Sequence, residues 1–144
     1  MATRYDSKHG IVSRPPFELY MGFTDLRNFA QMLPEDKKAE IEATFDTLTI
    51  TVQGFKIGVK VVERTPYSRI ILADDGAPFQ FTIEMHFDAT PAGKTDFFIR
   101  VDAELNMMMK MMLGSRIQKG LDQMVDALVA VSEGRKPNIP DMNF

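Results

Sequence analysis

The chain of 144 residues has no cysteine, no tryptophan and no long apolar run. Without cysteine it can form no disulfide framework, thiol nucleophile or thiolate metal site, and nothing indicates an oxidising compartment. The first ten residues, MATRYDSKHG, lack the apolar stretch of a signal peptide, and no run approaches the roughly 18 apolar residues that a membrane-spanning helix needs. We therefore expect a cytoplasmic protein without a membrane span.

The chain also lacks a strong excess of positive or negative charge. The 17 basic and 20 acidic residues are scattered and give a formal net charge of -3, so there is no basic footprint for nucleic acid. A chain of this length usually forms one domain and buries roughly 70% of its unfolded surface. We expect a single domain over residues 1–133. Residues 134–144, where two prolines interrupt any periodicity, are predicted to form a flexible tail.

Residues 4–12 alternate between two faces, which predicts a strand. The inward face of this predicted strand carries Tyr5, Ser7, His9 and Ile11.

Two short helices are predicted next. Pro16 suits the first position of a helix, where an amide needs no intrahelical acceptor. A second helix over about 26–33 can be capped by Thr24 or Asp25 and must end before Pro34. The charged stretch that follows, PEDKKAEIE, is predicted to be a solvated turn.

From about residue 41 to 105 the apolar residues recur with period two, between turn signals such as Asp74-Asp75-Gly76. Loops this short join antiparallel strands, because a parallel return needs a crossover of about a dozen residues. The clearest strands begin at Phe79 and Phe97. The pattern therefore predicts an antiparallel meander.

After residue 105 the period becomes 3.6. Gly114 suits a helix stop and Ser115 to Gln118 fits a capping box, so we expect a short helix over 106–113 and a long one over 116–132. The long helix is predicted to bury one stripe, composed of Ile117, Leu121, Met124, Leu128 and Val131.

This order of elements resembles the START-like superfamily, also called SRPBCC or helix-grip proteins. The resemblance covers about residues 4–132, and the stretches FTDLRNFAQMLPE, VVERTPYSRI and KMMLGSRIQKGLDQMVDALV look like short bacterial members. It implies an α+β helix-grip fold: a curved antiparallel sheet of six to seven strands wraps around a long C-terminal helix, with two short helices after the first strand. The superfamily includes lipid carriers, hormone binders, polyketide cyclases and activators of a chaperone ATPase, so the fold leaves the function open.

The resemblance also implies an apolar cavity between sheet and long helix, and such concave apolar pockets are typical small-molecule sites. We expect it to bind a small hydrophobic molecule, lipid-like or aromatic, without chemistry, metal or cofactor. Tyr5 and His9 would orient the polar end of that molecule. The predicted wall consists of Phe81, Met85, Phe97, Ile99, Val101, Met108, Met109 and Met112.

Five methionines fall within residues 107–112, and three interpretations of them stay open. They could line the cavity wall or its mouth, with Gly114 letting the short helix move as a gate. They could simply fill the core, or a partner in a homodimer could cover them.

Two further functions stay open. A polyketide cyclase- or dehydratase-like enzyme would have Tyr5, Ser7 and His9 as its acid–base groups. A protein-interaction module of the ATPase-activator type would use an exposed face. The sequence has no Gly-x-Ser-x-Gly motif and no glycine-rich phosphate loop, and its two histidines, expected on opposite faces of the sheet, make no ordinary metal triad.

Overall fold

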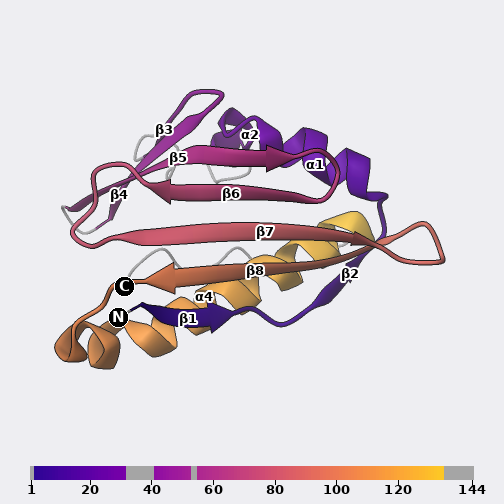
Figure 1. Ribbon diagram of the computed structural model, residues 1–144. Helices are drawn as coiled ribbons and strands as arrows, with labels where there is room; N and C mark the ends of the chain where they lie inside the picture. The colour runs from indigo at the N-terminus through magenta and orange to yellow at the C-terminus, as the bar shows by residue number, and fades with distance from the viewer. Residues whose placement is uncertain (1, 32–40, 53–54, 135–144) are drawn as a thin grey trace.

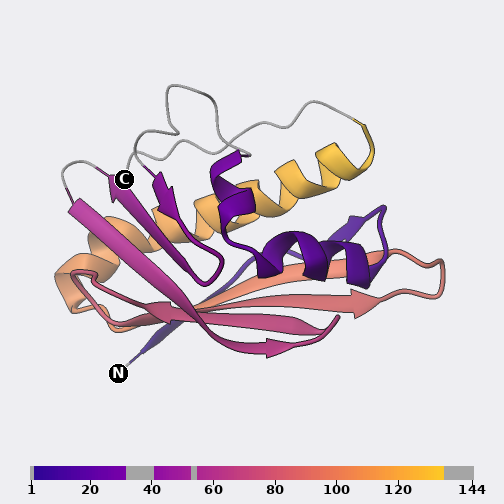
Figure 2. The ribbon, with the colours of Figure 1, turned by 90° about the horizontal axis from the view of Figure 1, so that it is seen from above.

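A computed structural model describes residues 2–31, 41–52 and 55–134 of the chain (Figure 1). Within these residues an antiparallel sheet carries three helices on one side, and β4 and β3 turn up toward that side (Figure 2). The elements in chain order are β1 (Thr3–Asp6), β2 (Gly10–Val12), α1 (Pro16–Thr24), α2 (Arg27–Gln31), β3 (Ile41–Ala43), β4 (Thr47–Val52), β5 (Phe55–Thr65), β6 (Arg69–Asp74), β7 (Phe81–Ala89), β8 (Thr95–Ala103) and α4 (Met107–Ser132).

The predicted meander is confirmed. The strand order is β1-β8-β7-β6-β5-β4-β3, with β2 also paired to β8, and all the pairs are antiparallel. The described part of the sheet has eight strands rather than six to seven, because the predicted first strand is two strands. Residues 32–40, which include the end of the predicted second helix and most of the predicted solvated turn, lie outside the described residues, as does the predicted tail apart from Gly134.

A bulge separates β1 from β2 and reverses which face each side chain occupies. Asp6 pairs with Arg100, whereas Gly10 pairs with Phe97, so four steps along the first segment match three along β8. One extra residue moves every later side chain to the other face of a sheet. Tyr5 therefore faces the helices as predicted, but the inward placement predicted for His9 is wrong.

The two short helices begin as predicted. Pro16 occupies the start of α1. The backbone N–H of Arg27 donates to the Asp25 carboxylate at 3.0 Å, which confirms Asp25 as the cap of α2. The Thr24 hydroxyl instead accepts a hydrogen bond of 2.6 Å from Nε of Arg64. That arginine, on β5, ties the end of α1 to the sheet.

The C-terminal helix is one helix, and the predicted break at Gly114 is wrong. It begins after Asn106, whose side chain accepts a hydrogen bond of 2.8 Å from the N–H of Met109. Inside a helix glycine costs only about 1 kcal/mol relative to alanine. Here a Cβ on Gly114 would lie 3.0 Å from the Tyr5 hydroxyl, so the glycine allows the phenol of β1 to approach the helix closely.

The face of α4 that packs on β1, β2 and β8 is centred on Leu121 and on the fully buried Val125. Ile117 and Leu128, both predicted, pack against the same core, whereas Met124 is 41% exposed. No helix in the described part of the chain is long and apolar enough to cross a membrane.

Candidate functional site

Five residues of the predicted cavity wall lie on the concave face of the sheet, as predicted. All of them are 8% exposed or less and belong to one apolar cluster, so their side chains contact protein. They are Phe81, Met85, Phe97, Ile99 and Val101.

Aromatic side chains fill the end of the concave face beneath α1. The ring of Phe23 stacks on Phe87 and on Phe97, with centroids 6.0 and 5.8 Å apart, and Phe29 lies against Phe23 at 5.1 Å. Phe87 and Phe97 also stack on each other at 5.6 Å. Stacked rings at these distances leave no room for a ligand between them, so any ligand site must lie elsewhere.

The two predicted polar residues do not come together. Tyr5 is partly buried on the concave face beside Gly114. His9 lies on the opposite face, where its Nδ1 is 2.8 Å from a carboxylate oxygen of Asp96 and its ring stacks on Phe98 at 4.4 Å.

The second histidine, His86, stacks on the same Phe98 ring at 4.5 Å. The two histidines, predicted to lie on opposite faces, therefore share the outer one. No group of three or more His, Asp or Glu side chains within the described ranges could hold a metal ion.

The methionines of α4 are mostly exposed. Met108 is 70% and Met112 is 64% exposed and neither lines the pocket described below, whereas Met109 packs against the core. The first turns of α4 also extend past the ends of β1 and β8 (Figure 1), where no strand in the described part of the chain covers their outer side.

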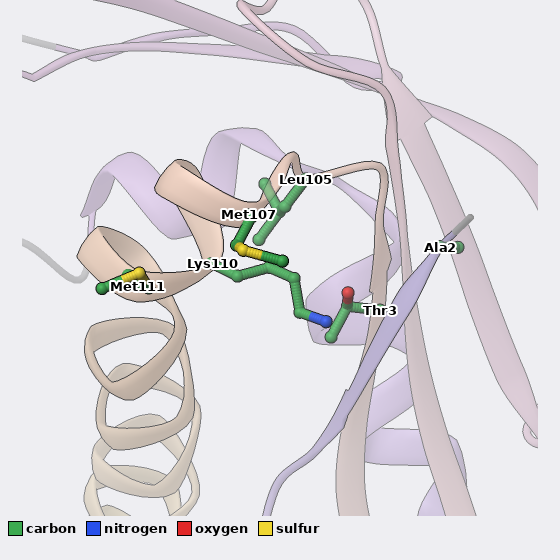
Figure 3. A pocket seen from close by; sticks show the side chains of 6 residues that line it. All are labelled: Ala2, Thr3, Leu105, Met107, Lys110 and Met111. Atoms are coloured by element: carbon green, nitrogen blue, oxygen red, sulfur yellow. The ribbon is translucent and has the colours of Figure 1, made fainter.

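A pocket of about 490 Å³ lies where the first turns of α4 meet the start of β1 (Figure 3). Its volume falls within the range of roughly 300–1,000 Å³ that is usual for small-molecule sites. Lys110 reaches from α4 toward Thr3 across it (Figure 3), and within the described residues its ammonium group has no carboxylate partner. The lining residues are Ala2, Thr3, Leu105, Met107, Lys110 and Met111.

None of these lining residues was among the predicted site residues. Lys110 could have been predicted from the sequence, since it is the only charged residue inside the methionine run. Thr3 could not, because it reaches the pocket only through the strand register that pairs it with Ala103 at the end of β8.

No family model and no curated relative matches the chain. A norcoclaurine synthase point mutant from Thalictrum flavum, solved with a transition-state analogue, superposes with a TM-score of 0.71 at 13% identity, over 93% of this chain and 96% of that one. A START superfamily protein from Mycobacterium smegmatis gives 0.64 at 14% identity, over 91% and 97%. The chain has a START-like, helix-grip fold.

A protein from Thermobifida fusca, solved by NMR, shares the START-like fold with a TM-score of 0.69 at 12% identity, over 98% of this chain and 99% of that one. Identities this low show the fold alone. One structure with the START-like fold, the synthase, holds a small molecule. The fold is therefore one that can bind ligands, and which ligand this chain takes must be argued from its own pocket.

Proposed function

We propose that the protein binds a small apolar molecule, lipid-like or aromatic, in the pocket where β1, the end of β8 and the start of α4 meet. This location is one end of the interface between sheet and C-terminal helix, where the resemblance predicts a cavity. The observation that carries the proposal is the pocket itself: about 490 Å³, with side chains of leucine and methionine around one lysine. The proposed site of action is the cytoplasm.

The chemistry of the lining suits such a ligand. Methionine side chains are unbranched and polarizable, so Met107 and Met111 can adapt to different apolar shapes. At about 25 cal/mol per Å² of apolar surface buried, a pocket this open contributes only a few kcal/mol before ordering costs, which corresponds to about millimolar affinity at best. Lys110 takes the orienting role that the sequence predicted for Tyr5 and His9, because its ammonium group faces the pocket.

An acid–base enzyme has less support. Of the three residues predicted for that chemistry, His9 lies on the outer face. The Ser7 hydroxyl accepts from the N–H of Ile99 and donates to the carbonyl of Lys8, both at 2.8 Å, so the backbone already satisfies it. Tyr5 is left without the other two members of the predicted set.

Two measurements test the proposal. The purified protein is denatured, and the released small molecules are identified by mass spectrometry. Separately, titration with an environment-sensitive apolar fluorophore measures binding by the wild type and by Met111→Gln, which places an amide in the pocket wall. Met108→Gln is the matched control, because Met108 lies on the same helix, is 70% exposed and does not line the pocket.

We expect saturable fluorophore binding that Met111→Gln weakens at least about fivefold and Met108→Gln leaves within about twofold, since each 1.4 kcal/mol of lost contact corresponds to a tenfold change. Absence of any co-purified molecule together with non-saturable fluorophore binding contradicts the proposal. Equal effects of the two substitutions would also contradict it, because the binding would then be to the exposed helix surface.

A further inference from the structure

The start of α4 exposes an unusual amount of apolar surface. Four methionines on its first two turns, here called the methionine patch, project into solvent with exposed fractions of 64–80%. Single exposed apolar residues are ordinary, but a contiguous group marks a surface that binds something. The methionine patch consists of Met107, Met108, Met111 and Met112.

Positive charge surrounds the patch. Lys110 lies within it, and the exposed Arg116 and Lys119 follow it on the same helix. Arg116 is four residues after Met112, so the two lie on neighbouring turns of one face. Between residues 105 and 121 the sequence contains no acidic residue; the closest are Glu104, which precedes the helix, and Asp122.

The acidic side chains beyond the patch are already engaged. Asp122 accepts a hydrogen bond of 2.7 Å from the backbone N–H of Lys8, and Asp126 pairs with the ammonium group of Lys8. On the neighbouring strands Asp102 pairs with Arg4 at 2.8 Å. From residue 104 to residue 119 the formal charge is +2, one acid against three bases, in a chain of net charge -3.

We propose that the methionine patch docks on a membrane surface containing anionic lipids. Helices that lie at a membrane interface bury an apolar face roughly 5–10 Å into the headgroup boundary and keep basic residues at the phosphates. The methionine patch supplies the apolar face, and Lys110, Arg116 and Lys119 supply the cations. The first turns of α4 lie at one corner of the molecule, beyond the ends of β1 and β8 (Figure 1), so neither strand stands between them and a flat surface.

Charge argues against a second copy of this chain as the occupant. A twofold contact centred on the methionine patch would bring Lys110 of one copy close to Lys110 of the other, because residues at the centre of such an interface meet their own copies. The acid closest to the patch, Glu104, is a single carboxylate against three bases. An anionic lipid surface, by contrast, attracts all three bases, each contributing about fivefold to partitioning at low salt.

Co-sedimentation with lipid vesicles tests the proposal. The intact protein is mixed with vesicles of phosphatidylcholine alone and with vesicles of phosphatidylcholine and phosphatidylglycerol. The apolar test variant combines Met108→Gln with Met112→Gln, neither of which lines the pocket. Its matched control combines Met21→Gln with Met124→Gln, which are 59% and 41% exposed elsewhere on the molecule.

Two further double variants, which remove positive charges, separate the electrostatic contribution to membrane binding from the apolar one. Arg116→Gln with Lys119→Gln removes two cations beside the methionine patch, and Lys56→Gln with Lys60→Gln removes two exposed cations from β5. All of the substituted side chains are exposed, so circular dichroism and thermal unfolding should match the wild type.

We expect binding to the anionic vesicles that weakens as salt rises, because the Debye length falls below about 10 Å above 0.1 M. Each patch variant should lose at least about tenfold in partitioning, and each control should stay within twofold of the wild type. Fluorophore binding in the pocket should be unchanged in Met108→Gln with Met112→Gln, which separates this proposal from the proposed function.

Three results would overturn the membrane proposal. The first is a failure of the wild type to sediment with anionic vesicles at low salt. The second is an equal loss in patch and control variants. The third is a dimer in sedimentation velocity that dissociates in the Met108→Gln with Met112→Gln variant, which would assign the methionine patch to a second copy of the chain.

Discussion

Gly10 allows the closest approach between the sheet and α4, and replacing it with alanine should destabilise the protein. A Cβ at this position would lie 2.6 Å from Cγ1 of Val125 and 2.8 Å from Cγ2 of Val129. Real carbon atoms do not come this close, and valine cannot rotate away cheaply because its side chain is stiff at χ1. The strand β2 or the helix must therefore shift.

The expected loss follows from the packing. Overpacking a dense core by one methyl group costs typically 1–3 kcal/mol, and Val125 is fully buried, so the upper half of that range applies. For a chain of 144 residues each kcal/mol lowers Tm by about 3 °C, which predicts a loss of about 6–9 °C for Gly10→Ala. Urea unfolding followed by circular dichroism measures the same change as a free energy.

Gly22→Ala provides the matched control. Gly22 lies inside α1, and nothing lies within 4 Å of the Cβ that alanine would add, so the substitution should stabilise by up to about 1 kcal/mol through helix propensity. A second check combines Gly10→Ala with Val125→Ala, whose effects should be less than additive because the two side chains compete for one space. If Gly10→Ala proved as stable as the wild type, the close packing between β2 and α4 described above would be refuted.

Three further predictions concern polar contacts. Arg64→Met should destabilise by about 1–3 kcal/mol in urea unfolding, because it leaves the buried hydroxyl of Thr24 without its 2.6 Å donor, whereas Arg69→Met, which breaks only an exposed ion pair, should cost under about 1 kcal/mol. His9→Ala should leave fluorophore binding within about twofold of the wild type, since the side chain lies on the outer face. A tenfold loss of binding would contradict this placement and show that His9 contacts the ligand. The hydrogen bond from Arg100 lowers the pKa of Asp6 in the folded protein, so the stabilisation from this ion pair is present above the unfolded pKa of about 3.9 and is lost as pH falls through the lower folded pKa. Because the Asp6 carboxylate is 45% exposed, this stabilisation is small. Asp6→Asn should therefore reduce the difference in unfolding free energy between pH 6 and pH 3, measured by urea unfolding, by only a few tenths of a kcal/mol.

Local patterns in the sequence determined most of the fold. Alternating apolar residues between turn signals predicted the meander from β3 to β8, and the positions of Pro16 and Asp25 predicted the starts of the two short helices. These features depend on backbone geometry within a few residues, which is why they can be read from the chain. The concave placement of Phe81, Met85 and Ile99 followed from the same period of two.

The features that local patterns misread were decided by contacts between distant segments. The bulge before Gly10 exists only relative to β8, and it places His9 on the outer face. Gly114 lies inside the helix and does not end it; the space that its missing side chain leaves is taken by Tyr5, more than a hundred residues earlier.

Exposure of the methionines is likewise a tertiary property. Composition predicted that they would be hidden, yet α4 begins past the ends of β1 and β8, where none of the described strands reaches them. The pocket beside them depends on Thr3 pairing with Ala103. The periodicity of apolar residues thus determined which helices and strands form and which face of each is apolar. The register between strands and the position of α4 relative to the strand ends decided which residues those faces contact. Both depend on residues far apart in the chain, so the sequence pattern alone could not predict them.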